Sequence, residues 1–273
     1  MAKVVLISGA SSGIGRVTSL ILAQAGYIVY AGTRDPSKFT INLDNLHVIT
    51  LDIADSKSVN AAINTICEEH GKIDVLINNA GYALVSTVED VTEEEMFAQF
   101  NINVFGVFRL CKAVTPFMRA ENSGVIINIS SFLGKVGLPL FTFYNSSKYA
   151  VEGITDSLRY ELSPFNIRVH SIMPGFFSTN FAKENLTINA SLMKTNTPYE
   201  RQAQNLIPNI AKQINEGNDA KEAAELVLKM IEDDTSPARA TVGDKASKFL
   251  AIRRELSDED FERRVKDYYN LNG

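Results

Sequence analysis

Residues 4–15 read Val4-Val5-Leu6-Ile7-Ser8-Gly9-Ala10-Ser11-Ser12-Gly13-Ile14-Gly15, and they give the first indication of the fold. The first four residues are a short, continuous apolar run, typical of a strand that is buried on both faces of a parallel sheet. A loop containing three glycines follows at once. From Arg16 to Gly26, apolar residues recur at helical spacing until a glycine ends the run. The predicted order is strand, glycine loop, helix.

This order indicates a binding site for a dinucleotide. A glycine loop between a buried strand and a helix brings backbone amides close to a pyrophosphate, and the helix N-terminus adds positive potential. The spacing here is G-x-x-x-G-x-G rather than the G-x-G-x-x-G of the usual fingerprint. A simple tight turn is the alternative interpretation. A second predicted strand, Tyr27 to Thr33, completes a βαβ unit.

The end of that second strand bears on which dinucleotide binds. An acidic residue there would hydrogen-bond the 2′-hydroxyl of the ribose, but this chain has Gly32-Thr33-Arg34-Asp35. The planar guanidinium of Arg34 suits a 2′-phosphate and favours NADP. Asp35 at the ribose position would instead favour NAD, and a solvated loop cation is the structural alternative for Arg34. We expect NADP, with NAD the less favoured cofactor.

Strands and helices alternate along the rest of the chain. Further strands are expected at Leu46–Leu51, Ile73–Ile77, Val125–Ile129, Ile167–Met173 and Ala240–Val242. Helices are expected from Asp55, from Thr92 through Met118 with Pro116 as a candidate kink, from Tyr144, from Asp219, and twice after Lys245. The alternation predicts an α/β fold, a single Rossmann-like doubly wound parallel sheet with helices on both faces, as one domain over residues 1–273. We expect a substrate-loop insertion at about 180–218, where periodicity is lost, and a C-terminal helical extension at about 245–273.

Tyr144 and Lys148 are four positions apart at the head of a predicted helix. Their side chains should leave the same face, roughly 5–6 Å apart at Cβ. A neighbouring ammonium favours the phenolate, which would lower the tyrosine pKa from about 10 toward a value useful for proton transfer. The pattern alone is weak, because Tyr-x-x-x-Lys occurs by chance in many helices.

Together these features resemble the short-chain dehydrogenase/reductase family, from Lys3 to about Thr179. The resemblance rests on the glycine loop, where the family usually has threonine in place of Ser8, and on further motifs in matching order and spacing. These motifs are Asn78-Asn79-Ala80-Gly81, Asn103, Ser131, Tyr144-x-x-x-Lys148 and Pro174-Gly175-x-x-x-Thr179. The resemblance implies a Rossmann-like domain that exchanges a hydride between a nicotinamide and an alcohol or carbonyl.

The resemblance also implies roles for individual residues. Tyr144 would be the acid/base, and Lys148 would lower its pKa and hydrogen-bond the nicotinamide ribose. Ser131 would hold the substrate oxygen, although it could merely cap a turn. Asn103, which the family's Asn-x-x-Gly pattern selects over Asn101, would support a water-linked proton path to Lys148. The implied cofactor-binding residues are Gly9, Ser11, Ser12, Gly13, Ile14, Gly15, Arg34, Asp52, Ile53, Asn79, Ala80, Gly81, Tyr144, Lys148, Pro174, Gly175 and Thr179.

The substrate pocket should be formed by the segments after Ser131 and after Pro174, which both leave strand ends beside the nicotinamide. Their apolar residues are Phe132, Leu133, Val136, Leu138, Phe141, Phe176, Phe177 and Phe181. Such a set suits a lipophilic carbonyl or secondary alcohol, while core packing is the alternative for at least half of it. The segment from Ser131 to Pro139 also resembles that of hydroxysteroid and retinol dehydrogenases.

Composition excludes several other classes of function. The net charge is −5 and the isoelectric point about 5.4, so no basic field invites nucleic acid. The isolated Cys67 and Cys111 predict free thiols in a reducing compartment. No signal peptide and no apolar run of roughly 18–20 residues is present, so we expect a cytoplasmic protein without a membrane span. His47, His70 and His170 show no metal-ligand spacing, and we predict no metal.

Two alternatives to an oxidoreductase remain at this point. One is a catalytically silent NADP-binding sensor or scaffold protein, which the intact Ser131, Tyr144 and Lys148 argue against. The other is a sugar-nucleotide epimerase or dehydratase, a group that shares Tyr-x-x-x-Lys but has glycines spaced G-x-x-G-x-x-G.

The resemblance further implies a homodimer or homotetramer, formed through the helices that start near Thr92 and Tyr144.

Overall fold

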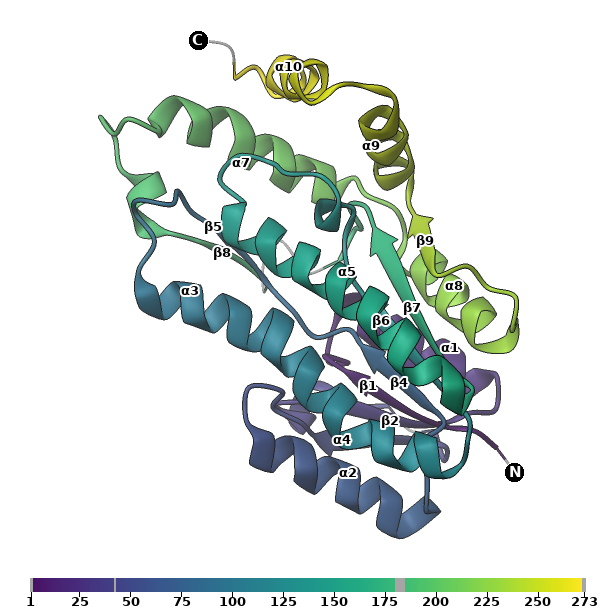
Figure 1. Ribbon diagram of the computed structural model, residues 1–273. Coiled ribbons are helices and arrows are strands. Elements are labelled where there is room, and N and C mark those ends of the chain that lie inside the picture. Colours follow the sequence, from purple (N-terminus) through teal and green to yellow (C-terminus); the bar gives the residue numbers. More distant parts are fainter. Residues whose placement is uncertain (1, 42, 180–184, 272–273) are drawn as a thin grey trace.

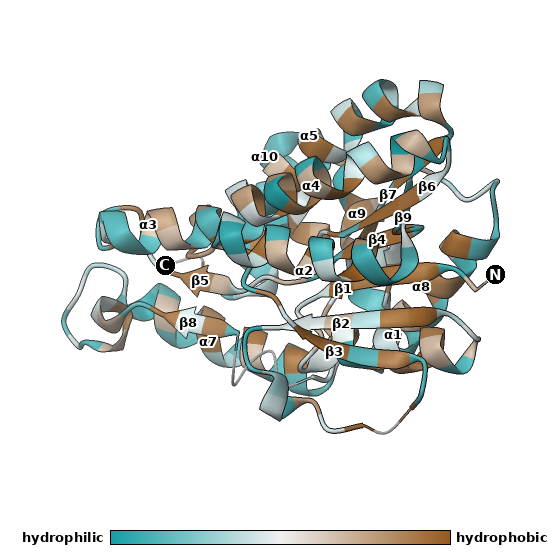
Figure 2. Ribbon diagram, turned by 90° about the horizontal axis from the view of Figure 1, so that it is seen from below, coloured by the Kyte–Doolittle hydropathy of each residue, from teal (hydrophilic) through white to brown (hydrophobic). Residues whose placement is uncertain are grey.

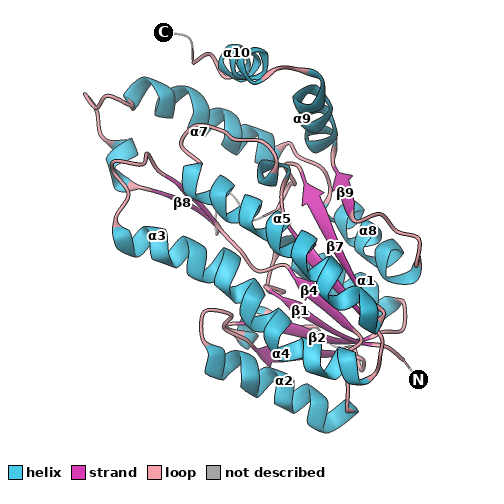
Figure 3. Cartoon of the chain, viewed as in Figure 1, coloured by secondary structure: helices cyan, strands magenta, loops and turns pink. Residues whose placement is uncertain are grey.

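The computed structural model describes residues 2–41, 43–179 and 185–271 (Figures 1 and 3). The described strands are β1 (Val4–Ser8), β2 (Ile28–Thr33), β3 (Leu46–Thr50), β4 (Val75–Asn78), β5 (Ala83–Val85), β6 (Gly124–Ile129), β7 (Ile167–Pro174), β8 (Leu186–Ile188) and β9 (Arg239–Val242). The longer helices are α1 (Gly13–Gln24), α2 (Ser56–His70), α3 (Glu93–Phe100), α4 (Gly106–Ala120), α5 (Thr142–Leu162), α7 (Glu200–Asn215), α8 (Ala220–Glu232), α9 (Asp244–Glu255) and α10 (Asp258–Tyr268). Short helical turns are η1 (Pro36–Lys38), the π-helical η2 (Asn101–Phe105), η3 (Phe132–Gly134), η4 (Ser163–Phe165) and η5 (Ala190–Met193).

Seven strands form one parallel sheet in the order β3-β2-β1-β4-β6-β7-β9. The chain winds outward from β1 to β3 and then returns to the other side of β1, so the strand order reverses between β1 and β4. All seven strands expected from the sequence are present, and the doubly wound prediction is confirmed. In such sheets, ligands bind beyond the carboxyl ends of the strands at the point of reversal.

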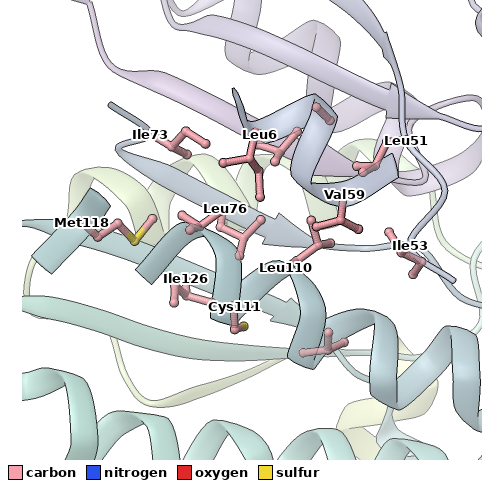
Figure 4. Close-up of a cluster of buried hydrophobic side chains, with 14 of the residues drawn as sticks. Leu6, Leu51, Ile53, Val59, Ile73, Leu76, Leu110, Cys111, Met118 and Ile126 are labelled. Carbon is pink, nitrogen blue, oxygen red and sulfur yellow. The ribbon is translucent and has the colours of Figure 1, made fainter. Parts of the chain in front are cut away.

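Helices cover both faces of the sheet, and an apolar core lies between the helices and the sheet on each face. On one face, α2, α4 and α5 pack over the strands; on the other lie α1 and α8 (Figure 1). Figure 4 shows the first core, in which Leu6, Leu76 and Ile126 from neighbouring strands meet side chains of α2 and α4. Much of the sheet is correspondingly hydrophobic in Figure 2. Burial on both faces explains why the central strands β1 and β4 are apolar up to their last residue instead of alternating.

The helix expected from Thr92 through Met118 is interrupted, though not at Pro116. The predicted capping box is present: Thr92 Oγ1 accepts from Glu95 N at 3.2 Å, and Glu95 Oε2 accepts from Thr92 N at 3.0 Å. After α3 the chain widens into the π-helical η2 and then continues as α4, which contains Pro116 and ends at Ala120. A π turn inserts one extra residue per turn, and such turns are frequent at functional sites.

The expectation of an irregular insertion at 180–218 is wrong for most of its described part. This segment contains β8, η5 and the 16-residue helix α7. The buried face of α7 is Ala203, Leu206, Ile210 and Ile214, a helical spacing that the many Asn and Gln residues and Pro208 obscured. β8 pairs in parallel with β5, a strand that the sequence did not predict.

The C-terminal part of the chain joins α7 in a third apolar cluster. The two helices expected after Lys245 are present as α9 and α10, and the short strand expected before them is β9. α7, α9 and α10 lie at the opposite end of the molecule from α2 (Figure 1). They pack there with the segment that follows β6. The organisation of residues 1–273 as a single domain stays a prediction.

Candidate active site

A cleft of about 1050 Å³ lies where the strand order reverses, beyond the carboxyl ends of β1, β2, β4, β6 and β7. It is lined by every residue expected to bind the cofactor except Gly15. These are Gly9, Ser11, Ser12, Gly13, Ile14, Arg34, Asp52, Ile53, Asn79, Ala80, Gly81, Tyr144, Lys148, Pro174, Gly175 and Thr179. The tertiary structure thus brings together residues that are spread over most of the chain.

The glycine loop is packed directly against the segment after β4. Gly9 has φ +69°, and a Cβ there would lie 2.7 Å from the Cα of Ala80. A Cβ on Gly15 would lie 2.4 Å from Asn79 Nδ2. That amide donates to the carbonyls of Ser8 at 2.9 Å and Gly9 at 3.0 Å. Gly15 therefore stands behind the loop, where it permits close packing, and does not face the cleft.

Ser8 fulfils a structural role at the position where the family usually has threonine. Its Oγ accepts from the backbone amides of Asn79 and Ala80, both at 3.1 Å. Because these bonds need only a hydroxyl, the replacement of threonine by serine keeps the two loops joined.

The N-terminus of α1 is suited to an anion. Ser12 is its N-cap residue, and within the described chain no side-chain hydrogen bond caps this end and no acidic residue lies in its first turn. The first amides of a helix have no partner within the helix and carry partial positive charge. The cradle that the loop and this helix end form fits the diphosphate of a dinucleotide.

Arg34 and Asp35 lie in different environments at the end of β2. Arg34 is exposed and lines the cleft, whereas Asp35 does not line it. Asp35 Oδ1 accepts from Ser37 N at 3.1 Å and from Ser37 Oγ at 2.6 Å, which caps η1. These hydrogen bonds also lower the pKa of Asp35. Lys38 lines the same part of the cleft as a second cation, and sequence reasoning missed it because only η1 brings it there.

Tyr144 is almost fully buried, at 9% exposure. Burial raises the pKa of its phenol to about 12, and the hydrogen bond with Ser131 opposes this only in part. The prediction that the pKa of Tyr144 is lowered is therefore wrong. Loss of hydration disfavours the phenolate more than the neighbouring groups favour it. Ser131 Oγ also accepts from Leu133 N at 3.1 Å, so it caps η3 as well as facing Tyr144.

Lys148 lies beneath Tyr144, as their spacing predicted. Its Nζ is 5.8 Å from the centroid of the Tyr144 ring and donates to the carbonyl of Ile129 at 2.9 Å. Burial lowers the pKa of the ammonium to about 8, while the charge of Glu152 acts in the opposite direction.

Asn103 faces the interior because η2 turns it there. Its Oδ1 accepts from Tyr82 N at 3.1 Å, and its Nδ2 donates to Tyr82 O at 2.9 Å and to Ser147 Oγ at 3.0 Å. A Cβ on Gly81 would lie 3.1 Å from Asn103 Oδ1 and 3.7 Å from Lys148 Nζ, so the two side chains are near neighbours. Asn101 instead accepts from Arg109 at 2.7 Å. The water-linked proton path through Asn103 stays a prediction.

Only part of the expected apolar wall faces the cleft. Leu133, Phe141, Phe176 and Phe177 line it. Phe132, Val136 and Leu138 are buried in the cluster behind it, which the core-packing alternative anticipated, and Phe181 is outside the described residues. The wall gains Ala83, Leu84, Leu186, Ile210 and Ile214 from β5, β8 and α7, elements that sequence reasoning did not predict.

The part of the chain that the structure describes offers neither a metal site nor a membrane span. No group of three or more His, Cys, Asp or Glu side chains in that part of the chain is arranged to hold a metal ion. None of the helices that the structure describes has the length and apolar character needed to cross a membrane.

A comparison with protein families agrees with this geometry. The model of the short chain dehydrogenase family matches residues 3–189. The chain belongs to this family. It is therefore an NAD(P)-dependent oxidoreductase acting on CH–OH groups.

Known proteins resemble the chain over most of its length. The 3-ketodihydrosphingosine reductase of Bacteroides thetaiotaomicron is 39% identical over 270 residues, which are 98% of each chain. A short-chain dehydrogenase from Streptomyces avermitilis is 30% identical and superposes with a TM-score of 0.85 over 100% of this chain and 99% of that one. ElxO with NADP bound is 25% identical and superposes with a TM-score of 0.72 over 89% and 96% of the two chains.

Proposed function

We propose that this short-chain dehydrogenase transfers a hydride between NADP(H) and a lipophilic carbonyl or secondary alcohol, with Tyr144 as the general acid/base. The observation that carries the proposal is the position of Tyr144. Its buried side chain lines one cleft with the glycine loop and Lys148 and with the apolar residues of β8 and α7. A phenol in this position can contact a bound dinucleotide on one side and an apolar substrate on the other.

The residues of the site suit carbonyl reduction at neutral pH. A bound reduced nicotinamide supplies the hydride. Tyr144, with a pKa of about 12, is protonated at neutral pH and can donate its proton to the carbonyl oxygen. Ser131 hydrogen-bonds the same phenol and would hold that oxygen. Lys148, with a pKa of about 8, is largely charged at pH 7 and compensates the negative charge left on Tyr144 when the proton departs.

The lining of the cleft and one relative support a lipophilic ketone as substrate. Leu133, Phe141 and Phe176 line the cleft, as do Ile210 and Ile214 of α7, all of which are apolar. The ketone in the name of the Bacteroides relative, 3-ketodihydrosphingosine, is accordingly the first compound to test.

We expect kcat/KM for ketone reduction to rise with the length of the apolar chain. Each methylene buried in the cleft contributes about 0.8 kcal/mol, which corresponds to roughly a four-fold increase until the cleft is filled. NADPH oxidation would be followed with 3-ketodihydrosphingosine and with a series of shorter aliphatic ketones. Tyr144→Phe is the background control. If no ketone is reduced faster by the wild type than by this variant, the silent sensor or scaffold alternative replaces the proposal.

The preference for NADPH should depend on Arg34. Removing its guanidinium with Arg34→Ala should weaken NADPH binding about 10- to 100-fold, because charge-assisted hydrogen bonds to a phosphate contribute roughly 1.5–3 kcal/mol. NADH binding should change little. Isothermal titration with both cofactors measures this, with Asp35→Asn as the control, since Asp35 caps η1 and does not line the cleft. Equal losses for NADPH and NADH would contradict the assignment of Arg34 to a 2′-phosphate.

We also propose that the protein is cytoplasmic, as its composition predicts, and that it forms a homodimer or homotetramer, as the resemblance implies. Phe97, Phe105 and Phe108 support an interface over α3 and α4, because these side chains are 68%, 47% and 49% exposed. A subunit contact would remove this apolar surface from water.

A further inference from the structure

A buried carboxylate lies one helical turn beyond Lys148 on α5. The side chain of Glu152 is only 2% exposed. Its Oε1 accepts from Ser171 Oγ of β7, and its Oε2 accepts from Arg239 Nε of β9 at 2.5 Å. Lys135, which follows η3, approaches Oε2 at 3.8 Å. Buried charges are retained when they are paired, and here partners from three other parts of the chain hold one carboxylate in place.

The position of Glu152 couples it to Lys148. Residues four apart on a helix face the same way, roughly 5–6 Å apart at Cβ. A Cβ on Gly134 would lie 3.0 Å from the carbonyl oxygen of Lys148 and 3.1 Å from Glu152 Cγ, so η3 packs tightly against this stretch of α5. The negative charge of Glu152 acts on the ammonium in the sense opposite to burial.

We propose that Glu152 is a positioning residue for Lys148, whose buried carboxylate, held by Ser171 and Arg239, keeps the ammonium charged beneath Tyr144. This inference rests on the proposed function, in which Lys148 must be charged when Tyr144 gives up its proton. Arg239 is then the opposing charge that limits the effect of Glu152.

The other charged groups around this pair are few in the described chain. Asp156 lies one turn further along α5, is 50% exposed and accepts from Arg239 at 2.5 Å. Lys135 is 40% exposed. His170 precedes Ser171 on β7 and points to the other face of the sheet, where its Nδ1 is 2.8 Å from the carbonyl oxygen of Pro237. Glu152 is thus the buried anion nearest to Lys148 along the helix.

Loss of Glu152 and loss of Arg239 should shift the pKa values of neighbouring groups in opposite directions. Removing a buried negative charge makes every neighbouring cation harder to keep charged and every neighbouring phenol easier to ionise, so all nearby pKa values fall. Removing the positive charge of Arg239 raises the same pKa values. The alkaline limb of the pH profile for ketone reduction should move with the pKa of Lys148, which at about 8 lies inside the range measured.

The experiment compares kcat/KM for NADPH-dependent ketone reduction in the intact protein and its variants across pH 6–11. This range extends about three units above the pKa of Lys148. Glu152→Gln should move the alkaline limb down by about one pH unit, and Arg239→Gln should move it up by a similar amount. Glu152→Asp, which keeps the charge, should restore most of the wild-type profile. Asp156→Asn is the matched control, because it removes an exposed partner of Arg239 and leaves Glu152 intact; its limb should stay within about 0.2 units.

A second readout measures Lys148 without turnover. Its rate of acetylation by acetic anhydride, followed by mass spectrometry as a function of pH, reports the pKa of the ammonium in the free protein. Glu152→Gln should shift this curve to lower pH, and Arg239→Gln should shift it to higher pH. Unchanged limbs, or shifts of both variants in the same direction, would overturn the inference. If Glu152→Gln does not fold, as judged by circular dichroism, the upward shift of Arg239→Gln decides. A wild type that reduces no ketone refutes the proposed function instead, and the acetylation curves still decide the role of Glu152.

Discussion

Replacing Tyr144 with phenylalanine should lower kcat for ketone reduction about 10²- to 10⁴-fold, the range that a positioned general acid contributes. The substitution removes the proton donor and keeps the ring. Tyr144 contacts Phe141 edge-on with the ring centroids 6.3 Å apart, and this packing does not involve the hydroxyl. NADPH affinity should therefore stay close to the wild-type value. Single-turnover oxidation of bound NADPH and a fluorescence titration measure the two quantities separately.

A matched control for this substitution exists on the same helix. Tyr149 follows Lys148 directly, but its side chain is 47% exposed and does not line the cleft. Tyr149→Phe should leave kcat and NADPH affinity unchanged. If Tyr144→Phe retained more than about a tenth of the wild-type kcat, a different group or water would be the proton donor and the assignment of Tyr144 would fail.

Replacing Gly9 with alanine should destabilise the protein and weaken NADPH binding. Alanine at φ +69° costs about 1–2 kcal/mol, and the new Cβ would lie 2.7 Å from the backbone of Ala80. Relief of such a clash typically costs about 1–3 kcal/mol more, so the free energy of unfolding should fall by roughly 2–5 kcal/mol. The shift that relieves this clash would move the glycine loop away from the Asn79–Gly81 segment, with which it lines the cleft, and would thereby weaken the proposed NADPH binding.

Substitutions of two other glycines distinguish backbone strain from the steric clash as the cause of the lost stability. Gly26 has φ +88° and open space around its Cβ position, so Gly26→Ala should show the backbone strain alone, about 1–2 kcal/mol. Gly153 lies within α5 with nothing within 4 Å of that position, and Gly153→Ala should stabilise the protein by about 0.5–1 kcal/mol. Urea denaturation measures all three. A loss for Gly9→Ala no larger than that for Gly26→Ala would show that the contact with Ala80 is not restrictive.

Much of the fold could be predicted from local pattern. The apolar runs at β1 and β4 are buried on both faces, and such runs are recognisable from neighbouring residues alone. The helix α7 was missed although its buried face has regular spacing, because Pro208 and its polar neighbours reduce helix propensity and only packing against the third cluster compensates for this. The π turn at Asn103 was also missed, since no local residue type specifies it.

Electrostatics of the site could be predicted least. The Tyr144–Lys148 spacing indicated that a phenol and an ammonium would be neighbours, and they are. It did not indicate that the pKa of Tyr144 would rise, because hydration of a side chain depends on every element that covers it. For the same reason the sequence favoured Arg34 but left Asp35 as a rival for the ribose, whereas in the structure Asp35 caps η1.

The succession of strands and helices along the chain and the glycine loop were thus determined by the sequence itself, which also indicated the candidate reacting side chains, because apolar periodicity and short motifs act over a few neighbouring residues. Only the tertiary structure decided which of those side chains share one cleft and which are buried. It also placed Glu152 near Lys148, with its carboxylate hydrogen-bonded by Ser171 and Arg239. Burial and charge are summed over all surrounding elements, and residues as distant in the chain as Glu152 and Arg239 contribute to that sum only once the sheet has formed.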